Sequence, residues 1–422
     1  MPMAARRRRV GAALAAAVVL AIGLAACSGP GVELDGPEQV DSALPEATVT
    51  ELSAAVENAM TAAGASGAII GVWAPWSGTW VSGFGTQRPG GGAEVTEDMT
   101  FRAARIGRPM TCDVLYRLVA DGRVKLDAAV SDYVGGVADL GDVTLEQLCN
   151  STSGIGAYQG QLQTLWLSNP ERRWQPLELA SYGLGQERKT EPGQAYRDSD
   201  AGYVLLGLAL ERATGKTAAE LIEEYVAEPL ALEATRLSNG SAQAGATVLA
   251  GAHSTRTDGV WNCTDPIDAT PVSASTGFTD SGIVTDIDDL GRYAQALSEG
   301  VLMPEGTDRW DSVQPAYNGA PAWYTIGGGT VQAGALTGQF GAVPGYITAA
   351  FADDETGLTV AVVLNNSAAG GGFGAYLAWE LAAIASKAPA TGSEPAPAAG
   401  LPWTPEQYHD AITDGAICAP AE

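Results

Sequence analysis

Two arginines one helical turn apart, Arg105 and Arg108, are the residues whose types and spacing bear most directly on chemistry. They lie in the stretch Phe101–Asp127, in which apolar residues recur at helical spacing until Asp121 and Gly122 interrupt the pattern. This pattern predicts an amphipathic helix that ends at a glycine. Side chains three residues apart project from one face of a helix, here near the end whose dipole favours anions. Two cations at this position therefore need acidic partners.

The surrounding residues resemble the region around the nucleophile in serine β-lactamases, DD-carboxypeptidases and related esterases. The resemblance is carried by Phe101–Ala104, by the triplet PMT that follows, and by a helix that ends in DGRVKLD. In that family the helix opens with S-x-x-K, in which the serine attacks a carbonyl carbon and the lysine helps to deprotonate it. The register places Arg105 at the serine and Arg108 at the lysine. A guanidinium can act neither as a nucleophile nor as a base at neutral pH.

Two further family motifs are substituted in the same way. The family's Y-x-N or S-x-N triplet precedes a helix that here begins GYVLLG, and it corresponds to Asp198-Ser199-Asp200. The family's K-T-G or H-x-G triplet precedes a turn that here is Pro344–Tyr346. By this spacing Gln339 replaces the basic residue, whereas Gly341 is kept, consistent with close approach of a backbone or a ligand to the strand. The resemblance thus implies a member of the family that has lost its catalytic groups.

The register brings Arg105, Arg108, Asp198 and Asp200 to one cleft. We expect a charge-compensated network there, for instance a bidentate pair between Arg105 and Asp200. The alternative is that all four side chains face solvent and interact little. Separations beyond about 4 Å for every cation–carboxylate pair would exclude the network. The expected ligand-binding residues are Arg105, Arg108, Asp198, Asp200, Gln339 and Gly341.

A substitute nucleophile is the alternative to an inactive site. The nearest hydroxyls in register are Thr111, Ser151 and Ser199, and none has a lysine three residues later. His253 and His409 lie outside the three motifs and outside any triad-like context. We therefore expect a binding protein, with an active serine hydrolase that uses a non-standard nucleophile as the alternative.

The resemblance extends over about residues 48–387 and implies the α+β fold of β-lactamases and transpeptidases. This fold has an antiparallel sheet flanked by helices and a mostly helical inserted lobe. The sequence pattern agrees with it: a helix over Thr48–Ala63, a hairpin within Gly67–Gly85, strands within Trp323–Leu364 and a closing helix over Phe373–Lys387.

Residues 1–26 are typical of a bacterial lipoprotein signal peptide. The basic segment Arg6–Arg9 precedes the apolar segment Gly11–Ala26, and Leu24–Cys27 has the form of a lipobox. The apolar segment has about 16 residues, which is short for the ~20 residues that span a bilayer. We expect Cys27 to become the lipidated first residue of the mature protein, on the extracytoplasmic face of the cell membrane.

Three stretches outside the predicted domain lack periodic patterns. Residues 27–47 are rich in Gly, Pro and acidic residues and predict a flexible tether. The low-complexity residues 388–400 predict a linker, and residues 401–422 form an appendage. A protein partner at the cell envelope, if there is one, would be expected to use this appendage.

The charge balance argues against several classes of partner. Removal of residues 1–26 takes away four arginines and leaves 19 basic and 49 acidic residues, a net charge of −30. Such a charge disfavours nucleic acid and electrostatic attachment to anionic lipid. Hydrophobic residues make up 46% of the chain, which is enough for a substantial core and excludes global disorder.

Besides Cys27 the chain has four cysteines, Cys112, Cys149, Cys263 and Cys418. In an exported protein an even number favours disulfides, and four cysteines allow three pairings. Free buried thiols are the alternative. The family resemblance favours Cys112 with Cys149 and Cys263 with Cys418. No CxxC spacing occurs, so we expect neither a metal nor a cofactor.

These expectations combine into one functional prediction. The chain is predicted to be a lipid-anchored, β-lactamase-related pseudoenzyme of the cell envelope. Because the family acts on acylated D-alanyl peptides and β-lactams, a peptidoglycan stem peptide is the first candidate ligand and an envelope protein the second. An arginine pair could hold a peptide carboxylate without cleaving the peptide. The alternative is an active hydrolase of the DD-carboxypeptidase or esterase type.

Overall fold

The computed structural model describes residues 31–137, 140–238, 247–392, 395–398 and 400–418. The predicted signal peptide and Cys27 lie outside the described residues. The predicted helix over 48–63 is present and begins two residues earlier, and the predicted closing helix is present over Gly371–Ala385. The helix that carries Arg108 ends at Ala120, and Gly122 follows with a φ of +68°, a conformation that favours glycine.

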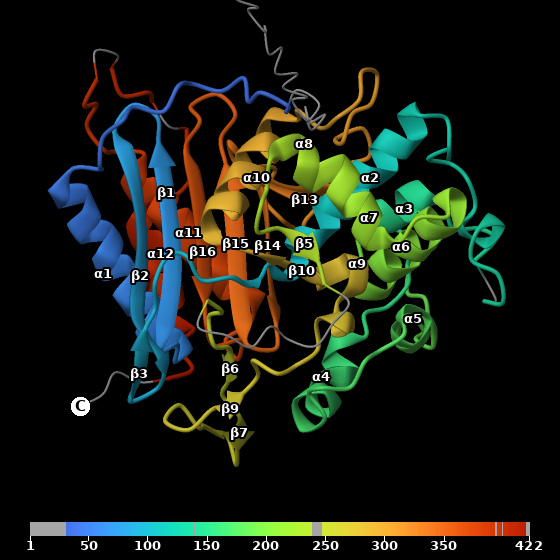
Figure 1. Ribbon diagram of the computed structural model, residues 1–422, viewed down its shortest axis with the longest axis horizontal. Helices are drawn as coiled ribbons and strands as arrows, with labels where there is room; N and C mark the ends of the chain where they lie inside the picture. Colours follow the sequence, from blue (N-terminus) through green and yellow to red (C-terminus); the bar gives the residue numbers. More distant parts are fainter. Residues whose placement is uncertain (1–30, 138–139, 239–246, 393–394, 399, 419–422) are drawn as a thin grey trace, which may run out of the picture. The chain divides into compact units, whose positions relative to one another are not determined.

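A sheet of nine antiparallel strands is the centre of the described chain (Figure 1). Its strand order is β11-β12-β13-β14-β15-β16-β1-β2-β3. Every residue of β15 and β16 is buried, because helices cover both faces of the sheet there. The strands of this sheet are β1 (Gly67–Ala74), β2 (Gly78–Arg88), β3 (Gly91–Glu94), β11 (Gln314–Pro315), β12 (Tyr324–Gly327), β13 (Thr330–Ala333), β14 (Leu336–Val343), β15 (Tyr346–Ala352) and β16 (Thr359–Leu364).

The helices divide between the two faces of the sheet (Figure 1). Helices α1, α11 and α12 pack on one face, whereas α10 and a helical lobe formed by α2–α9 lie on the other. Neighbouring strand residues such as Ile69 and Ile70 accordingly belong to different hydrophobic cores, since successive side chains of a strand point to opposite faces. The helices are α1 (Glu46–Ala63), α2 (Gly107–Ala120), α3 (Leu145–Cys149), α4 (Gln159–Ser168), α5 (Pro176–Leu184), α6 (Asp200–Thr214), α7 (Ala218–Ile222), α8 (Glu228–Leu230), α9 (Phe278–Ser281), α10 (Ile287–Glu299), α11 (Gly371–Ala385) and α12 (Pro405–Asp414).

Short strand pairs connect the lobe to the large sheet. Strands β4, β10 and β5, in that order, form a second sheet, and β4 directly precedes the segment that carries Arg105. Two further pairs, β6–β9 and β7–β8, form a projection at the bottom of the view in Figure 1. The bounds of these strands are β4 (Phe101–Arg102), β5 (Arg236–Leu237), β6 (Ala252–His253), β7 (Arg256–Thr257), β8 (Val260–Trp261), β9 (Ile267–Asp268) and β10 (Ile283–Thr285).

The stretches predicted to lie outside the domain are held against it. The described part of the predicted tether, residues 31–47, ends in the first two residues of α1. Ahead of them the N–H of Val32 donates to Pro229 O and Leu44 is buried. It is therefore packed where a free tether was expected. The appendage contains α12, whose Tyr408 and Ile412 are buried against the domain. Burial of these apolar side chains fixes the appendage to the domain.

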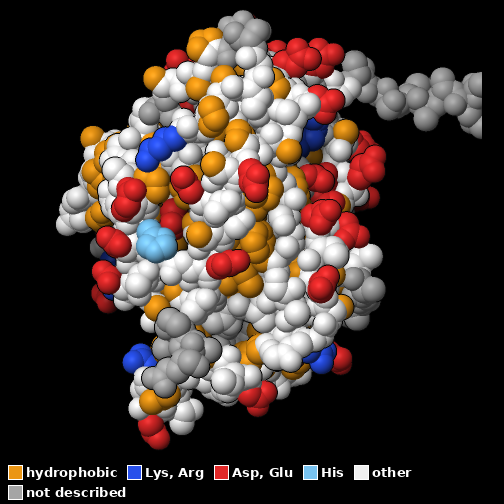
Figure 2. All heavy atoms as spheres, turned by 90° about the vertical axis from the view of Figure 1, so that its left-hand side faces the viewer, with side chains coloured by type: hydrophobic (Ala, Val, Ile, Leu, Met, Phe, Trp, Pro, Cys, Tyr) orange, Lys and Arg blue, Asp and Glu red, His pale blue; other side chains and the backbone are white. Residues whose placement is uncertain are grey.

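The exposed surface reflects the composition. Acidic side chains outnumber basic ones on the face shown in Figure 2, which includes α1. None of the described helices has the length and apolar character needed to cross a membrane.

Candidate functional site

The three substituted motifs meet at the junction of the sheet and the helical lobe. Arg105 lies in a 3₁₀ turn, Ala104–Ile106, that leads directly into α2, and Arg108 lies in the first turn of that helix. Asp198 precedes α6, and Gln339 lies on β14. The sequence register therefore predicted correctly which segments come together.

Asp198 is the centre of a charge network. Its Oδ2 accepts a hydrogen bond from Arg105 Nη2 and its Oδ1 one from Arg108 Nη1, each at 2.7 Å. The Arg105 and Asp198 side chains are 28% and 35% exposed, whereas that of Arg108 is 3% exposed. Burial would raise the pKa of Asp198, but the two guanidinium groups outweigh burial and hold the pKa well below its usual range. Of the predicted charge-compensated network, the pairs of both arginines with Asp198 are present.

Arg108 has a second carboxylate partner that the motifs did not predict. Its Nε donates to Asp280 Oδ1 at 2.7 Å, and its guanidinium lies 4.8 Å from the centre of the Tyr203 ring. Burial would lower the pKa of Arg108, but Asp280 and Asp198 outweigh it and raise the pKa. Two buried or half-buried cations are thus balanced by two carboxylates.

The predicted pair of Arg105 with Asp200 is wrong. Asp200 is the first residue of α6, and its carboxylate accepts the backbone N–H groups of Tyr158 at 2.6 Å and Gln159 at 2.9 Å. These N–H groups belong to the start of α4, which otherwise lacks acceptors for them. Burial and the charge of Asp280 raise the pKa of Asp200 to about 7, against the lowering effect of the backbone donors. Asp200 therefore stabilises a helix end and does not balance Arg105.

Gln339 and Gly341 have structural contacts of their own. Gln339 Nε2 donates to Gly329 O at 2.7 Å, and Gln339 Oε1 accepts the N–H of Phe340 at 2.9 Å. A Cβ on Gly341 would lie 2.6 Å from Cγ of Arg105. The close approach expected at Gly341 is therefore made by the Arg105 side chain, which a larger residue would displace.

A cleft of about 380 Å³ lies beside this network. Arg105, Asp198 and Asp200 line it, whereas Arg108, Gln339 and Gly341, also predicted to bind the ligand, do not. The remaining lining residues are Ala157, Gln159, Gly160, Gln163, Phe340, Ala342, Val343, Pro344, Ser367, Ala368, Gly370, Gly371 and Gly372. A larger hollow of about 1010 Å³ opens beside α5, but no motif residue lines it. The smaller cleft is the candidate site because the motif positions converge on it.

The three hydroxyls that the sequence suggested as substitute nucleophiles all form structural hydrogen bonds. Thr111 Oγ1 donates to the backbone, with Gly107 O at 2.8 Å and Thr279 O at 2.7 Å. Ser199 caps α6 by accepting the N–H of Gly202, and Ser151 pairs with the hydroxyl of Tyr203. All three are buried and none lines the cleft.

One hydroxyl–imidazole contact was not predicted. Ser367 lines the cleft, and its Oγ lies 2.8 Å from Nδ1 of His253. The two residues are separated by 114 positions and neither belongs to a family motif, so only their proximity in space reveals the pair.

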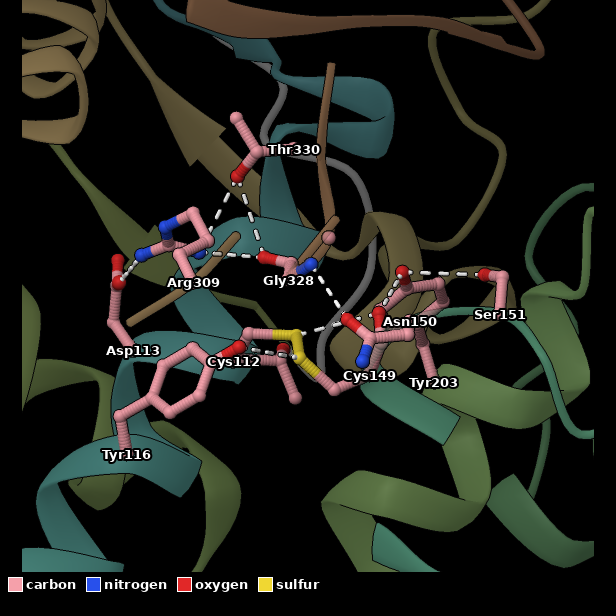
Figure 3. Close-up of a disulfide and its surroundings, with 12 residues drawn as sticks. Cys112, Asp113, Tyr116, Cys149, Asn150, Ser151, Tyr203, Arg309, Gly328 and Thr330 are labelled. Atoms are coloured by element: carbon pink, nitrogen blue, oxygen red, sulfur yellow. Dashed lines mark hydrogen bonds and ion pairs between the residues drawn. A yellow bond between two sulfur atoms is a disulfide. The ribbon is translucent and has the colours of Figure 1, made fainter. Parts of the chain in front are cut away.

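The predicted disulfides are both present. Cys112–Cys149 joins α2 to α3, with 5.7 Å between the Cα atoms, and Cys263–Cys418 ties the appendage to the segment between β8 and β9. Figure 3 shows the first disulfide next to Asn150, whose Oδ1 accepts the N–H of Gly328 at 2.7 Å. The helix that carries Arg108 is thus fixed to the end of α3, and the next residue, Asn150, contacts the turn between β12 and β13.

The fold and the motif positions can be compared with those of known proteins. The Beta-lactamase family model matches residues 52–383. The chain belongs to the beta-lactamase family. Its nine-stranded antiparallel sheet flanked by helices is the α+β fold expected from the sequence.

Members of the beta-lactamase family similar to this chain include hydrolases. The D-alanyl-D-alanine-carboxypeptidase/endopeptidase AmpH of Escherichia coli (strain K12) is 29% identical over 162 residues, which are 36% of this chain and 40% of AmpH. A D-aminopeptidase of Brucella ovis is 25% identical over 257 residues, 60% of this chain and 47% of that enzyme. The matched region thus spans less than half the length of either relative.

A solved structure supports the fold independently. A D-stereospecific amidohydrolase from Streptomyces sp. superposes with a TM-score of 0.64 at 23% sequence identity. The match covers 74% of this chain and 94% of that enzyme.

Proposed function

We propose that this member of the beta-lactamase family is a binding protein in which no acyl transfer takes place at the family's nucleophile position. The observation that carries the proposal is the pairing of Arg105 and Arg108 with Asp198. A guanidinium held by a carboxylate can neither attack a carbonyl carbon nor accept a proton at neutral pH. The motif therefore supplies charge and shape to the cleft and no reactive group.

The proposed ligand is a peptidoglycan-type peptide that ends in a carboxylate. Arg105 uses Nη2 for Asp198, and 28% of its side chain remains exposed where it lines the cleft. A guanidinium has five N–H donors, so donors remain for a ligand carboxylate. The name of AmpH, a D-alanyl-D-alanine carboxypeptidase, supports a peptide with that terminus. Arg108 is too deeply buried to contribute directly.

Calorimetric titration with a stem pentapeptide ending in D-alanyl-D-alanine tests this function. We expect saturable binding, and binding weaker by about tenfold to a hundredfold when the terminal carboxylate is replaced by a carboxamide, because a charge-assisted hydrogen bond is lost. Arg105→Gln should weaken binding similarly. Arg88→Gln is the matched control, since Arg88 is 74% exposed and its carboxylate partner is 3.9 Å away. Absence of binding, or covalent modification by a fluorescent penicillin at a motif residue, would overturn the proposal.

The proposed location is the extracytoplasmic face of the cell membrane, with a lipid on Cys27. The lipobox and the preceding basic and apolar segments support it. Metabolic labelling with an alkynyl fatty acid should modify the wild-type protein and not Cys27→Ala. Labelling of the variant, or release of the wild-type protein in unlipidated form, would contradict the proposal.

An envelope protein is the second proposed partner, with the appendage as its contact surface. Because α12 is packed against the domain and Cys418 beyond it is disulfide-bonded to Cys263, such a partner would meet a fixed surface. Deletion of residues 401–422 should then abolish its co-purification and leave peptide binding intact.

A second candidate function is ester or peptide hydrolysis by a hydroxyl outside the three motifs. Its support is the contact between Ser367 and His253 in the wall of the same cleft. The names of the relatives, a carboxypeptidase/endopeptidase and an aminopeptidase, agree with a hydrolytic function.

A further inference from the structure

A hydroxyl, an imidazole and an amide form a chain of contacts at the cleft. Ser367 Oγ lies 2.8 Å from His253 Nδ1, and His253 Nε2 lies 3.1 Å from the side-chain amide nitrogen of Gln163. A flip of this amide exchanges its nitrogen and oxygen, and the oxygen would accept the N–H of Nε2. In that arrangement Nδ1 is free to accept the proton of the Ser367 hydroxyl. Ser367, His253 and Gln163 would then be arranged as nucleophile, base and orienting group, as in the catalytic triads of hydrolases.

The backbone holds this chain of contacts in place. The N–H of Ser367 donates to Ala252 O at 3.1 Å, and the N–H of Ala252 donates to Asn365 O at 2.8 Å. Residue 252 lies beside His253 on β6, so the serine and the histidine sit on adjacent, hydrogen-bonded segments. Gln163 comes from α4, whose start is held by the carboxylate of Asp200. Backbone hydrogen bonds therefore place Ser367, which lies between β16 and α11, and regular elements place His253 and Gln163, which favours a reproducible geometry.

The surroundings favour proton transfer from the hydroxyl. The N–H of Gly345 donates to Ser367 Oγ at 3.0 Å, a contact that stabilises negative charge developing on this oxygen. Burial lowers the pKa of His253, so the imidazole is neutral at neutral pH and able to accept a proton. Ser367 itself is 6% exposed and lines the cleft, as does Gln163.

We propose that Ser367 and His253 are a nucleophile–base pair that hydrolyses small carboxylic esters in this cleft, with Gln163 as a positioning residue. The inference depends on the second candidate function and on the cleft as the ligand site. It is independent of binding at Arg105, because none of its groups belongs to the three motifs.

The reaction divides into two balanced steps. Ser367 Oγ forms a bond to the acyl carbon while the bond from that carbon to the leaving oxygen breaks. The serine proton passes to His253 Nδ1 and from there to the leaving oxygen, which departs as an alcohol. The oxygen of water then bonds to the acyl carbon and gives one proton to His253, while the bond from that carbon to Ser367 Oγ breaks. His253 returns the proton to Ser367 Oγ, and a carboxylic acid is released. The sum is ester plus water to acid plus alcohol.

The lining of the cleft indicates the substrate class. Gly371 and Gly372 are the first residues of α11 and line the cleft, and N–H groups at a helix start lack acceptors within the helix. Such N–H groups can stabilise the oxyanion of the tetrahedral intermediate that precedes the acyl-enzyme. Small residues, including Ala368 and Gly370, border this region and leave room for short acyl groups. Esters are the proposed substrates because an alkoxide leaves more readily than an amide anion.

Mass spectrometry after treatment with a fluorophosphonate, together with the rate of p-nitrophenyl acetate hydrolysis, tests the proposal. The wild-type protein should carry one adduct on Ser367, and Ser367→Ala should carry none. His253→Gln should react at least about a hundredfold more slowly, the usual contribution of a general base. Ser254→Ala is the matched control, since Ser254 is a buried hydroxyl next to His253 with its own partner, Asn366. Thermal melts should show that each variant is folded.

Gln163 is tested by rescue. Gln163→Leu should slow acylation by about tenfold because the imidazole loses its orienting acceptor, and Gln163→Glu, which keeps an acceptor oxygen, should restore most of the rate. A residue with a merely structural role would give equal rates in the two variants when their melting temperatures are equal.

The outcomes separate this inference from the proposed binding function. An unmodified folded wild-type protein, or an adduct at another residue, would overturn the Ser367–His253 assignment. If peptide binding to Ser367→Ala persists in that case, the binding function stands. If Ser367 is acylated but no stem peptide binds, the binding function falls and the esterase assignment stands.

Discussion

Arg108 and Asp280 form an ion pair that is buried on both sides, with 2.7 Å between Nε and Oδ1 and side chains that are 3% and 2% exposed. Such a pair is costly to break from one side, because the remaining charge is left in a medium of low polarity. Asp198 provides Arg108 with a second carboxylate and also pairs with Arg105. The charges of the two arginines are therefore balanced only when both Asp198 and Asp280 are counted. Arg108, Asp198 and Asp280 therefore depend on one another.

Removal of the Asp280 charge should destabilise the protein. We expect Asp280→Asn to lower the free energy of unfolding by about 3 kcal/mol, the low end for a broken buried pair because Asp198 still balances Arg108. Urea unfolding measures the loss. Glu178→Gln is the control: it breaks an Arg172–Glu178 pair whose side chains are each 35% exposed, and it should cost less than about 1 kcal/mol. Equal losses in the two variants would contradict the buried-pair assignment.

Acid should weaken the network through Asp198. Its folded-state pKa is lowered, so its contribution is present above the unfolded pKa, about 4, and is lost as the pH falls below that value. As the pH falls through this window, the free energy of unfolding of the wild-type protein should decrease by about 1–2 kcal/mol more than that of Asp198→Asn. This value already includes a reduction for solvent screening, because the Asp198 side chain is 35% exposed. Unfolding curves at pH 7, 4 and 3 measure it. Parallel profiles for the two proteins would show that Asp198 is not stabilised by the arginines.

Sequence pattern predicted the segments of the site better than the directions of its side chains. The motif register places Asp198 and Asp200 together, yet only Asp198 reaches the arginines. Asp200 begins α6, and this position directs its carboxylate to the N–H groups that start α4. Spacing along a chain does not determine such a choice, because it depends on where another helix begins.

The residues that sequence reasoning missed are long-range partners. Asp280 lies 172 residues from Arg108 in a helix of four residues, too short to show periodicity. Ser367 and His253 likewise come from separate segments without a motif. In contrast, most predicted helices and strands were correct within a few residues, since apolar periodicity and glycine turns are local signals.

Introducing only the family's first motif should not give acyl transfer at that position. In Arg105→Ser combined with Arg108→Lys, the introduced lysine would lie between Asp198 and Asp280, which favour its charged form and prevent it from acting as a base. We expect no covalent labelling by a fluorescent penicillin.

The matched comparison adds Asp198→Tyr and Gln339→Lys, which return groups of the other two family motifs. Labelling of the double variant at the introduced serine would show that the carboxylates do not block the chemistry. Both variants require a melting curve, because loss of the guanidinium groups leaves buried carboxylates without their partners.

The two disulfides should differ in their response to a reductant. Both sulfur-bearing residues of Cys112–Cys149 are fully buried, whereas Cys263 is partly exposed. Thiolate attack requires access to a sulfur, so native protein in dithiothreitol should lose Cys263–Cys418 first and Cys112–Cys149 only on unfolding. Alkylation followed by peptide mass spectrometry measures the order. Reduction of Cys112–Cys149 in the folded protein would contradict the prediction.

Loss of Cys263–Cys418 should loosen the appendage. This disulfide closes a sequence separation of 155 residues, so its removal in Cys263→Ser combined with Cys418→Ser should cost about 2–4 kcal/mol. Noncovalent contacts, among them the buried side chains of Tyr408 and Ile412, then hold the appendage, and its opening exposes residues 401–418 to protease. Limited proteolysis should cut the variant there faster than the wild-type protein. Equal cutting rates would mean that apolar packing of α12, and not the disulfide, holds the appendage.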